Sequence, residues 1–488
     1  MNVLSITALA ENIVIKTDGG TENVTVRAYS PASRENLCLY EAAVSLSAGE
    51  LTVPRTVNGR DGLFLRWEVT ADDVIVPGKK YVEILDFPRV SEEDYPQAGT
   101  IKGLQVTNIE DAVALGVRHA AQNVAITDLI RSRPSEDTIT FRFDGRDYYF
   151  DSARVAYHDR TIKELSSHGI IVTLILLCAR HWNVETPEDM YSALLHPGYL
   201  PHMREEDVHL SAFNVTSDEG IRHSAAFLAF LTARYTDPSA EHGRAVGFII
   251  SNEINSQWVW GNAGEMLAAD YMREYTTALR LAWQVSTSIY KNHRVYISLD
   301  HFWTGSLVPA EPEKYYGGRD VLTCLNRYAR EEGNFYWNMA FHPYPEDLNF
   351  PDFWNDKTAS DDFDTYRITF KNLRVLARYL GQEEYLYNGE RRRIILSEQG
   401  FNSHWTEESE ILQACAYGRA YRICMEIPEI DSFILHAHRD NAGEFGLNLG
   451  LWRRKRDSNE LDAPKPIYYV FKAIDRKDES GKYHWERY

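Results

Sequence analysis

The pattern of hydrophobic and polar positions changes once along the chain, near residue 100. Before about residue 90, short segments such as NIVIKT and LFLRWEVT alternate apolar and polar residues between turns rich in Gly, Asp and Pro. Alternation puts one face of a strand in a core and the other in water, so these segments predict a small antiparallel β-sandwich over 1–90. The acidic, proline-bearing segment 91–99 is the predicted linker.

From residue 100 onward, continuous apolar runs alternate with amphipathic helical patterns. Apolar runs without alternation are typical of strands that are buried on both faces of a parallel sheet. Eight of them occur, at 102–106, 119–126, 170–178, 245–251, 294–300, 336–344, 392–400 and 431–440, and a helical pattern accompanies each. Eight such units predict an α/β fold, a (β/α)8 TIM barrel over 100–488.

Two local features of the barrel region are also predicted. An Asp-Gly turn between two alternating runs predicts a β-hairpin over 138–151, inserted after the second strand. The apolar spacing over 363–380 predicts a helix between the sixth and seventh strands.

Two of the predicted strands end in a glutamate. The fourth ends in Asn252-Glu253 and the seventh in Ser397-Glu398, followed by Gln399-Gly400. Active sites of TIM barrels lie at the carboxyl ends of the strands. Cleavage of a glycosidic bond uses two carboxyl groups, one to protonate the leaving oxygen and one at the anomeric carbon. A single strand-end glutamate is more often a surface residue, but two of them favour a catalytic role.

On these residues the chain resembles the clan A retaining glycoside hydrolases, TIM barrels that include families 5 and 39. The resemblance covers about residues 100–475. It implies that Glu253 is the general acid/base, that Glu398 is the nucleophile and that Asn252 bonds the 2-hydroxyl of the sugar. It also implies cleavage of β-linked oligo- or polysaccharides by double displacement, with no cofactor and no metal.

Other strand ends and long loops supply candidate substrate contacts. The sixth strand ends in His342-Pro343-Tyr344, and the resemblance implies that His342 or Tyr344 bonds Glu398 and holds it ionised. Long loops are expected to wall a cleft, and their indole rings are surfaces on which a pyranose stacks. The remaining predicted contacts are Asn123, Arg180, His181, Trp258, Trp303, Trp405 and His436.

The chain departs from the resemblance at two places. Ile254 follows the predicted acid/base, where many members have proline. The eighth strand offers His436-Ala437-His438 where a tryptophan usually lies under the sugar, so Trp452 or Trp405 is the expected substitute.

Composition restricts the partners. The net charge of −19, from 52 Lys and Arg against 71 Asp and Glu, argues against nucleic acid and against an anionic membrane surface. No apolar run is long enough to span a bilayer. The N-terminus shows no signal peptide, and five scattered cysteines favour a reducing compartment. The expected location is cytoplasmic, or secreted with the signal peptide absent from this chain; the oligomeric state is open.

Three alternative functions remain at this level. A transglycosylase would use the same covalent intermediate and transfer it to a sugar hydroxyl. A metal-dependent hydrolase is suggested by His436-Ala437-His438, although such barrels need further ligands at other strand ends. A non-catalytic carbohydrate-binding barrel would be expected to lack one of the two carboxylates, and both are present.

Overall fold

The alternating N-terminal segments form two four-stranded sheets in the computed structural model, which describes residues 1–20, 23–180 and 188–487. One sheet has the strand order β10-β1-β2-β5 and the other β4-β3-β8-β9. Pairing is antiparallel except between β1 and β10, which run parallel, so the predicted pairing is wrong at this one edge. The strands of these two sheets are β1 (Val3–Ala8), β2 (Asn12–Thr17), β3 (Asn23–Tyr29), β4 (Cys38–Ser45), β5 (Glu50–Pro54), β8 (Arg66–Ala71), β9 (Val74–Ile75) and β10 (Ile84–Leu85). A separate two-stranded hairpin is formed by β6 (Thr56–Val57) and β7 (Arg60–Asp61).

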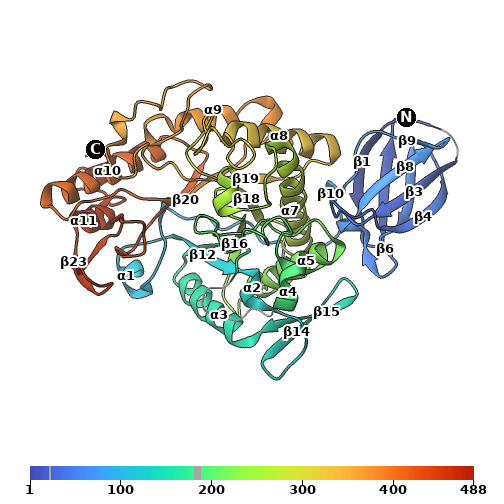
Figure 1. Cartoon of the computed structure of the whole chain (residues 1–488), viewed down its shortest axis with the longest axis horizontal. Coiled ribbons are helices and arrows are strands. Elements are labelled where there is room, and N and C mark those ends of the chain that lie inside the picture. Colours follow the sequence, from blue (N-terminus) through green and yellow to red (C-terminus); the bar gives the residue numbers. More distant parts are fainter. Residues whose placement is uncertain (21–22, 181–187, 488) are drawn as a thin grey trace.

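The eight apolar runs close into a parallel barrel, which confirms the predicted TIM barrel. Its strands are β11 (Lys102–Leu104), β12 (His119–Ala125), β16 (Ile171–Leu177), β17 (Ala245–Ile250), β18 (Arg294–Leu299), β19 (Trp337–Phe341), β20 (Ile394–Gln399) and β21 (Ile430–Leu435). Every residue of β17 and β19 is buried, because helices cover the outside and side chains fill the inside. Figure 1 shows the sandwich beside the barrel at the N-terminal end of the chain.

Helices and two small sheets complete the barrel. The helices are α1 (Ile109–Ala114), α2 (Ile126–Leu129), α3 (Ser152–Ser167), α4 (Glu188–Leu194), α5 (Asp218–Tyr235), α6 (Gln257–Trp260), α7 (Ala268–Ile289), α8 (Gly318–Glu332), α9 (Arg374–Leu380), α10 (Glu407–Met425) and α11 (Pro466–Ala473). The hairpin β14 (Thr138–Phe143) and β15 (Arg146–Asp151) is confirmed, and β13 (Ile130–Arg131) extends it. A second hairpin joins β22 (Trp452–Arg454) to β23 (Leu461–Pro464).

The helix predicted over 363–380 forms only at its C-terminal end. A short 3-10 turn, Phe370–Asn372, precedes α9, and the Asn372 amide donates to the backbone oxygens of Ser360 and Arg367. The segment before it pairs with the loop after β18, where Trp303 N donates to Tyr366 O at 2.9 Å. Backbone groups committed to a neighbouring loop are lost to a helix, so the prediction is wrong for residues 363–369.

Inside the barrel, seven inward-facing side chains from seven strands form a separate apolar cluster: Ala121, Ile175, Ile249, Tyr296, Ala340, Ile395 and Ile434. The polar residues at the carboxyl ends of the strands lie directly beyond this apolar cluster. The linker passes under the opposite face, where Arg294 lies 3.6 Å above the ring of Tyr95. Among the described residues, no helix combines the length and apolar character that crossing a membrane requires.

The sandwich is held to the barrel by a buried ionic contact. Arg60, 4% exposed, bonds Asp144 in the turn of the β14–β15 hairpin at 2.5 Å. The same guanidinium lies 3.1 Å from Asp218, the first residue of α5. One cation therefore joins three segments that are distant in the sequence.

We predict that Arg60→Ala destabilises the protein by about 3–5 kcal/mol, because it leaves two facing carboxylates without their cation. Chemical unfolding, followed by circular dichroism, measures the change. Arg142→Ala is the matched control: its ion pair with Asp147 in the same hairpin is exposed, so its loss should cost under about 1 kcal/mol. An equal effect of the two variants would contradict the prediction.

Candidate active site

A strained turn at the end of β17 presents Glu253. Ser251 and Glu253 both have positive φ, +66° and +35°, in the left-handed region that residues with a Cβ rarely adopt. Ser298, in β18, stabilises the turn by accepting a hydrogen bond from Glu253 N at 3.0 Å. The turn therefore directs the Glu253 carboxylate toward the barrel mouth.

A buried aspartate braces the same turn. Asp300, 8% exposed, accepts hydrogen bonds from Asn255 Nδ2 and Ser256 Oγ, both at 2.5 Å. Burial, followed by the charge of Glu253, raises the pKa of Asp300. Sequence reasoning missed this residue, although its place at the end of the fifth strand was a signal of the kind that identified Glu253 and Glu398. Its partners are the residues after Glu253, so it positions the acid/base candidate.

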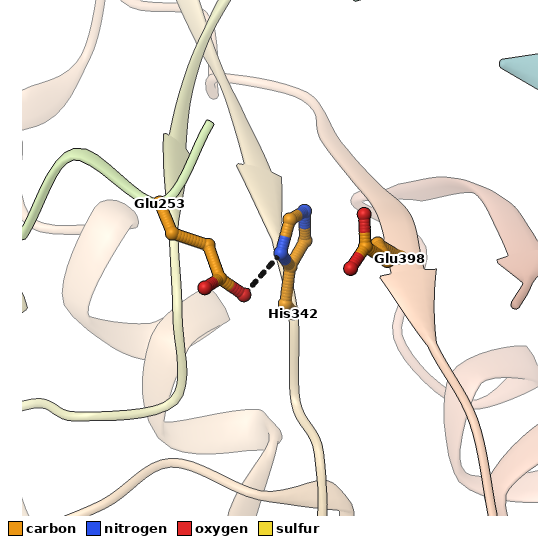
Figure 2. A group of neighbouring side chains, drawn as sticks. All are labelled: Glu253, His342 and Glu398. Carbon is orange, nitrogen blue, oxygen red and sulfur yellow. Dashed lines mark hydrogen bonds and ion pairs between the residues drawn. The ribbon is translucent and has the colours of Figure 1, made fainter. Parts of the chain in front are cut away.

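His342 lies between the two glutamates, as Figure 2 shows. Its Nδ1 is 2.7 Å from Glu253 Oε1, and its Nε2 is 2.9 Å from Ser397 Oγ. One oxygen of Glu253, one oxygen of Glu398 and one ring nitrogen of His342 all lie within 4.8 Å of one another. Burial alone would lower the pKa of His342, but the hydrogen bond and charge of Glu253, with the charges of Glu398 and Asp300, raise it.

The sequence predicted that His342 or Tyr344 bonds Glu398, and in the structure Tyr344 is the residue that does so. Tyr344 OH donates to Glu398 Oε1 at 3.4 Å, whereas His342 bonds Glu253. Burial, and then the charge of Glu398, raises the pKa of Tyr344 well above its usual value. The phenol therefore keeps its proton and remains a donor to Glu398.

His436 occupies the place where the resemblance implies a tryptophan. Its Nδ1 lies 2.6 Å from Gln105 Oε1 and its Nε2 lies 2.9 Å from Glu444 Oε1, so both ring nitrogens face acceptors. Burial lowers its pKa, but the hydrogen bond to Glu444 and the charges of Glu398 and Glu444 raise it above the usual value. An imidazolium, able to donate from both nitrogens, fits this setting.

His438 points elsewhere. Its Nε2 bonds Asp111 at 2.9 Å, and that carboxylate also accepts from Trp452 Nε1 at 2.7 Å. His436 and His438 therefore do not share a ligand position. In the described part of the chain, the group that brings three potential metal ligands together is Glu253, His342 and Glu398.

The predicted stacking tryptophans are placed in the packing of the loops. Trp303 is 0% exposed and donates to Phe363 O; Trp258 is 4% exposed and donates to Asp207. Both rings are buried in this structure, so neither presents an exposed face to a sugar. Trp405 is half-buried, and the guanidinium groups of Arg454 and Arg456 lie 5.1 and 5.5 Å from its ring.

The remaining predicted contacts lie around the mouth. Asn123 is exposed at the end of β12, and Asn252 is half-buried next to Glu253. Arg180 is half-buried after β16, while His181 lies outside the described residues. The structure thus brings together Glu253, Glu398, His342, Tyr344 and His436.

Comparisons with known proteins add a family. The profile of a family described as "Family of unknown function (DUF5722)" matches residues 94–485. No curated protein matches the chain. Among solved structures, a family 39 glycoside hydrolase from Bacteroides cellulosilyticus WH2 is similar, with 13% identity, a TM-score of 0.46, and coverage of 96% of this chain and 80% of that chain.

Two further solved structures are similar at the same level. One is Fpglu1 from Fervidobacterium pennivoraus, with 12% identity, a TM-score of 0.49, and coverage of 78% of this chain and 86% of that chain. The other is a family 1 β-glucosidase from Thermotoga maritima, with 11% identity, a TM-score of 0.44, and coverage of 79% and 95%. At these identities the likeness carries no information about activity.

The raised pKa of His436 predicts a pH-dependent stability. A histidine whose pKa is higher folded than unfolded stabilises the fold fully below about pH 6.5, its unfolded pKa, and this contribution is lost as pH rises through the folded value. The difference in unfolding free energy between the native protein and His436→Gln should therefore shrink as pH rises above about 6.5. Glu444→Gln should flatten the native protein's pH profile in the same range, and a constant difference would contradict the prediction.

Proposed function

Because the chain belongs to DUF5722, a family of unknown function, we propose its activity from the site: it is a retaining glycoside hydrolase that cleaves β-linked bonds in oligo- or polysaccharides. The observation that carries the proposal is the pair of facing carboxylates at the ends of β17 and β20. Their nearest oxygens lie within 4.8 Å. Retaining enzymes separate the two carboxyl groups by about 5–5.5 Å, whereas inverting enzymes leave about 6.5–9.5 Å for a water.

In the first step, a Glu398 oxygen attacks the anomeric carbon while the bond to the leaving oxygen breaks. Glu253 gives its proton to that oxygen, and a covalent glycosyl-enzyme remains. In the second step, water attacks the same carbon, its proton passes to Glu253 and the bond to Glu398 breaks. Two displacements return the sugar with its original anomeric configuration.

The neighbours of the two glutamates support these roles. Glu253 and His342 are joined by a 2.7 Å hydrogen bond, so the proton that the first step consumes and the second returns is shared by a half-buried carboxylate and a buried imidazole. Tyr344 donates to Glu398 and stabilises its ionised form before attack. Asn252, beside Glu253, is the candidate donor to the sugar 2-hydroxyl.

A transglycosylase would share every step up to the covalent intermediate. Products formed with and without an added acceptor sugar separate the two activities: only the transferase makes a longer oligosaccharide as its main product. Because Glu253, His342 and Glu398 could also hold a metal ion, the same assays include a chelator. Activity that persists in the chelator supports the metal-free mechanism.

We predict that Glu398→Gln lowers turnover of an aryl glycoside by several orders of magnitude while leaving the melting temperature nearly unchanged, because the amide is isosteric but not nucleophilic. Initial rates of 4-nitrophenol release over a panel of sugars measure this. Glu265→Gln is the matched control, since Glu265 is 57% exposed in the loop after β17. Near-native turnover in Glu398→Gln would end the assignment.

We also predict that the first anomer released has the configuration of the substrate. Proton NMR of the anomeric region, recorded within seconds of mixing, distinguishes the two anomers before mutarotation. Appearance of the inverted anomer first would show that a water, and not Glu398, attacks the sugar.

A further inference from the structure

A cavity lies at the mouth of the barrel, next to His436. It has a volume of about 360 Å3 and opens between the carboxyl ends of β11, β12 and β21 and the helix α3. Its polar lining includes Gln105, Asn123, His436 and Glu444, and Tyr157 stands at its outer side. A cavity of this size, with convergent polar groups, falls within the range of small-molecule sites.

The cavity lies on the Glu398 side of the barrel mouth, because two of its lining residues bond the residues that flank Glu398 in the chain. Gln105 donates to the backbone oxygen of Ser397 at 3.4 Å, and His436 N donates to Gln399 O at 2.9 Å. These contacts tie two lining residues to the residues on either side of Glu398. In the closed order of strands, β21 pairs with β20, whereas β16 separates β12 from β17, which carries Glu253.

The reaction mechanism indicates which part of the substrate lies on each side of the two glutamates. Glu398 bonds the sugar that is cleaved, and Glu253 protonates the oxygen of the part that leaves. The leaving part therefore extends on the Glu253 side. The rest of the chain, attached to the cleaved sugar at its non-reducing side, extends past Glu398.

The lining matches an uncharged, hydroxyl-rich ring. Amides of Gln105 and Asn123 offer donors and acceptors, and His436 and Glu444 form an ion pair at 2.9 Å. Asp440, also in the lining, is paired with Lys465 at 2.9 Å, and the exposed guanidinium of Arg439 offers further donors to hydroxyl groups. Tyr157, on the outer surface of α3, is 55% exposed and offers an aromatic face to the C–H groups of a sugar.

We propose that this cavity binds a second, uncharged sugar unit, the one next to the cleaved residue on its non-reducing side. The enzyme then prefers substrates with at least two sugars on that side over single glycosides. The inference rests on the proposed glycoside hydrolase activity and adds a substrate class to it.

The test compares pairs of 4-nitrophenyl substrates that differ by one sugar: β-glucoside with β-cellobioside, β-xyloside with β-xylobioside, and β-mannoside with β-mannobioside. For the pair that is cleaved, kcat/KM for release of nitrophenol should be at least about tenfold higher for the bioside. Tyr157→Ala and Asn123→Ala should each lower the ratio of bioside to monoside kcat/KM by about tenfold, the effect of losing one good contact. Tyr469→Ala is the matched control, an exposed tyrosine on α11 that is 60% exposed and outside the cavity.

Two failures are distinguishable. If the protein cleaves monosides as well as biosides, or if both cavity variants keep the native ratio, the cavity proposal is overturned while the hydrolase stands. If no substrate releases nitrophenol, the proposed activity falls, and calorimetric titration of the three biosides then tests the cavity alone. Binding that weakens about tenfold in Asn123→Ala supports it, and absence of binding overturns it.

Discussion

The site depends on one chain of hydrogen bonds across the barrel mouth, from Glu253 through His342 to Ser397. It joins the ends of three barrel strands, β17, β19 and β20, through a side chain that is 1% exposed. Because His342 is buried, it cannot replace either partner with water, and its two bonds fix the Glu253 carboxylate and the Ser397 side chain next to Glu398. The nearest oxygens of Glu253 and Glu398 lie within 4.8 Å, although β18 and β19 separate their strands.

The two glutamates have different charged and polar neighbours. Glu253 faces an imidazole whose pKa is raised and a buried aspartate, Asp300, whose pKa is raised. Glu398 receives the phenol of Tyr344 and lies near the imidazole of His436. Two carboxyl groups with different partners are suited to the separate tasks of acid and nucleophile. The strained backbone at Glu253 belongs to the same design, because Ser298 and Asp300 hold it from the adjacent strand end.

Periodicity was sufficient for the fold, because a strand buried on both faces leaves a continuous apolar run that few other elements produce. It was also sufficient to locate Glu253 and Glu398, since a charge at the end of such a run has few structural explanations. The same reasoning did not anticipate the burial of Trp258 and Trp303, because proximity in sequence to a strand end does not say which side of a loop faces outward. Their burial is decided by partners at Asp207 and Phe363, which are distant in the sequence.

The partners of His342 and the role of Asp300 were beyond sequence reasoning for a related reason. Each is defined by which neighbouring strand end it meets, and that depends on the stagger of strands around the barrel. The helix expected over 363–380 does not form in its first part, because loop residues near 303 form hydrogen bonds with the backbone groups there. The helix propensity of this segment was overridden by a tertiary contact, which cannot be recognised from the local sequence pattern.

The buried ion pair between Arg60 and Asp144 connects the sandwich to the β14–β15 hairpin of the barrel. Arg60 holds the turn of the β14–β15 hairpin, and that hairpin leads directly into α3, which carries Tyr157. The sandwich and the cavity are therefore linked through one continuous segment of chain, from Asp144 in the turn of the hairpin to Tyr157 in the cavity lining.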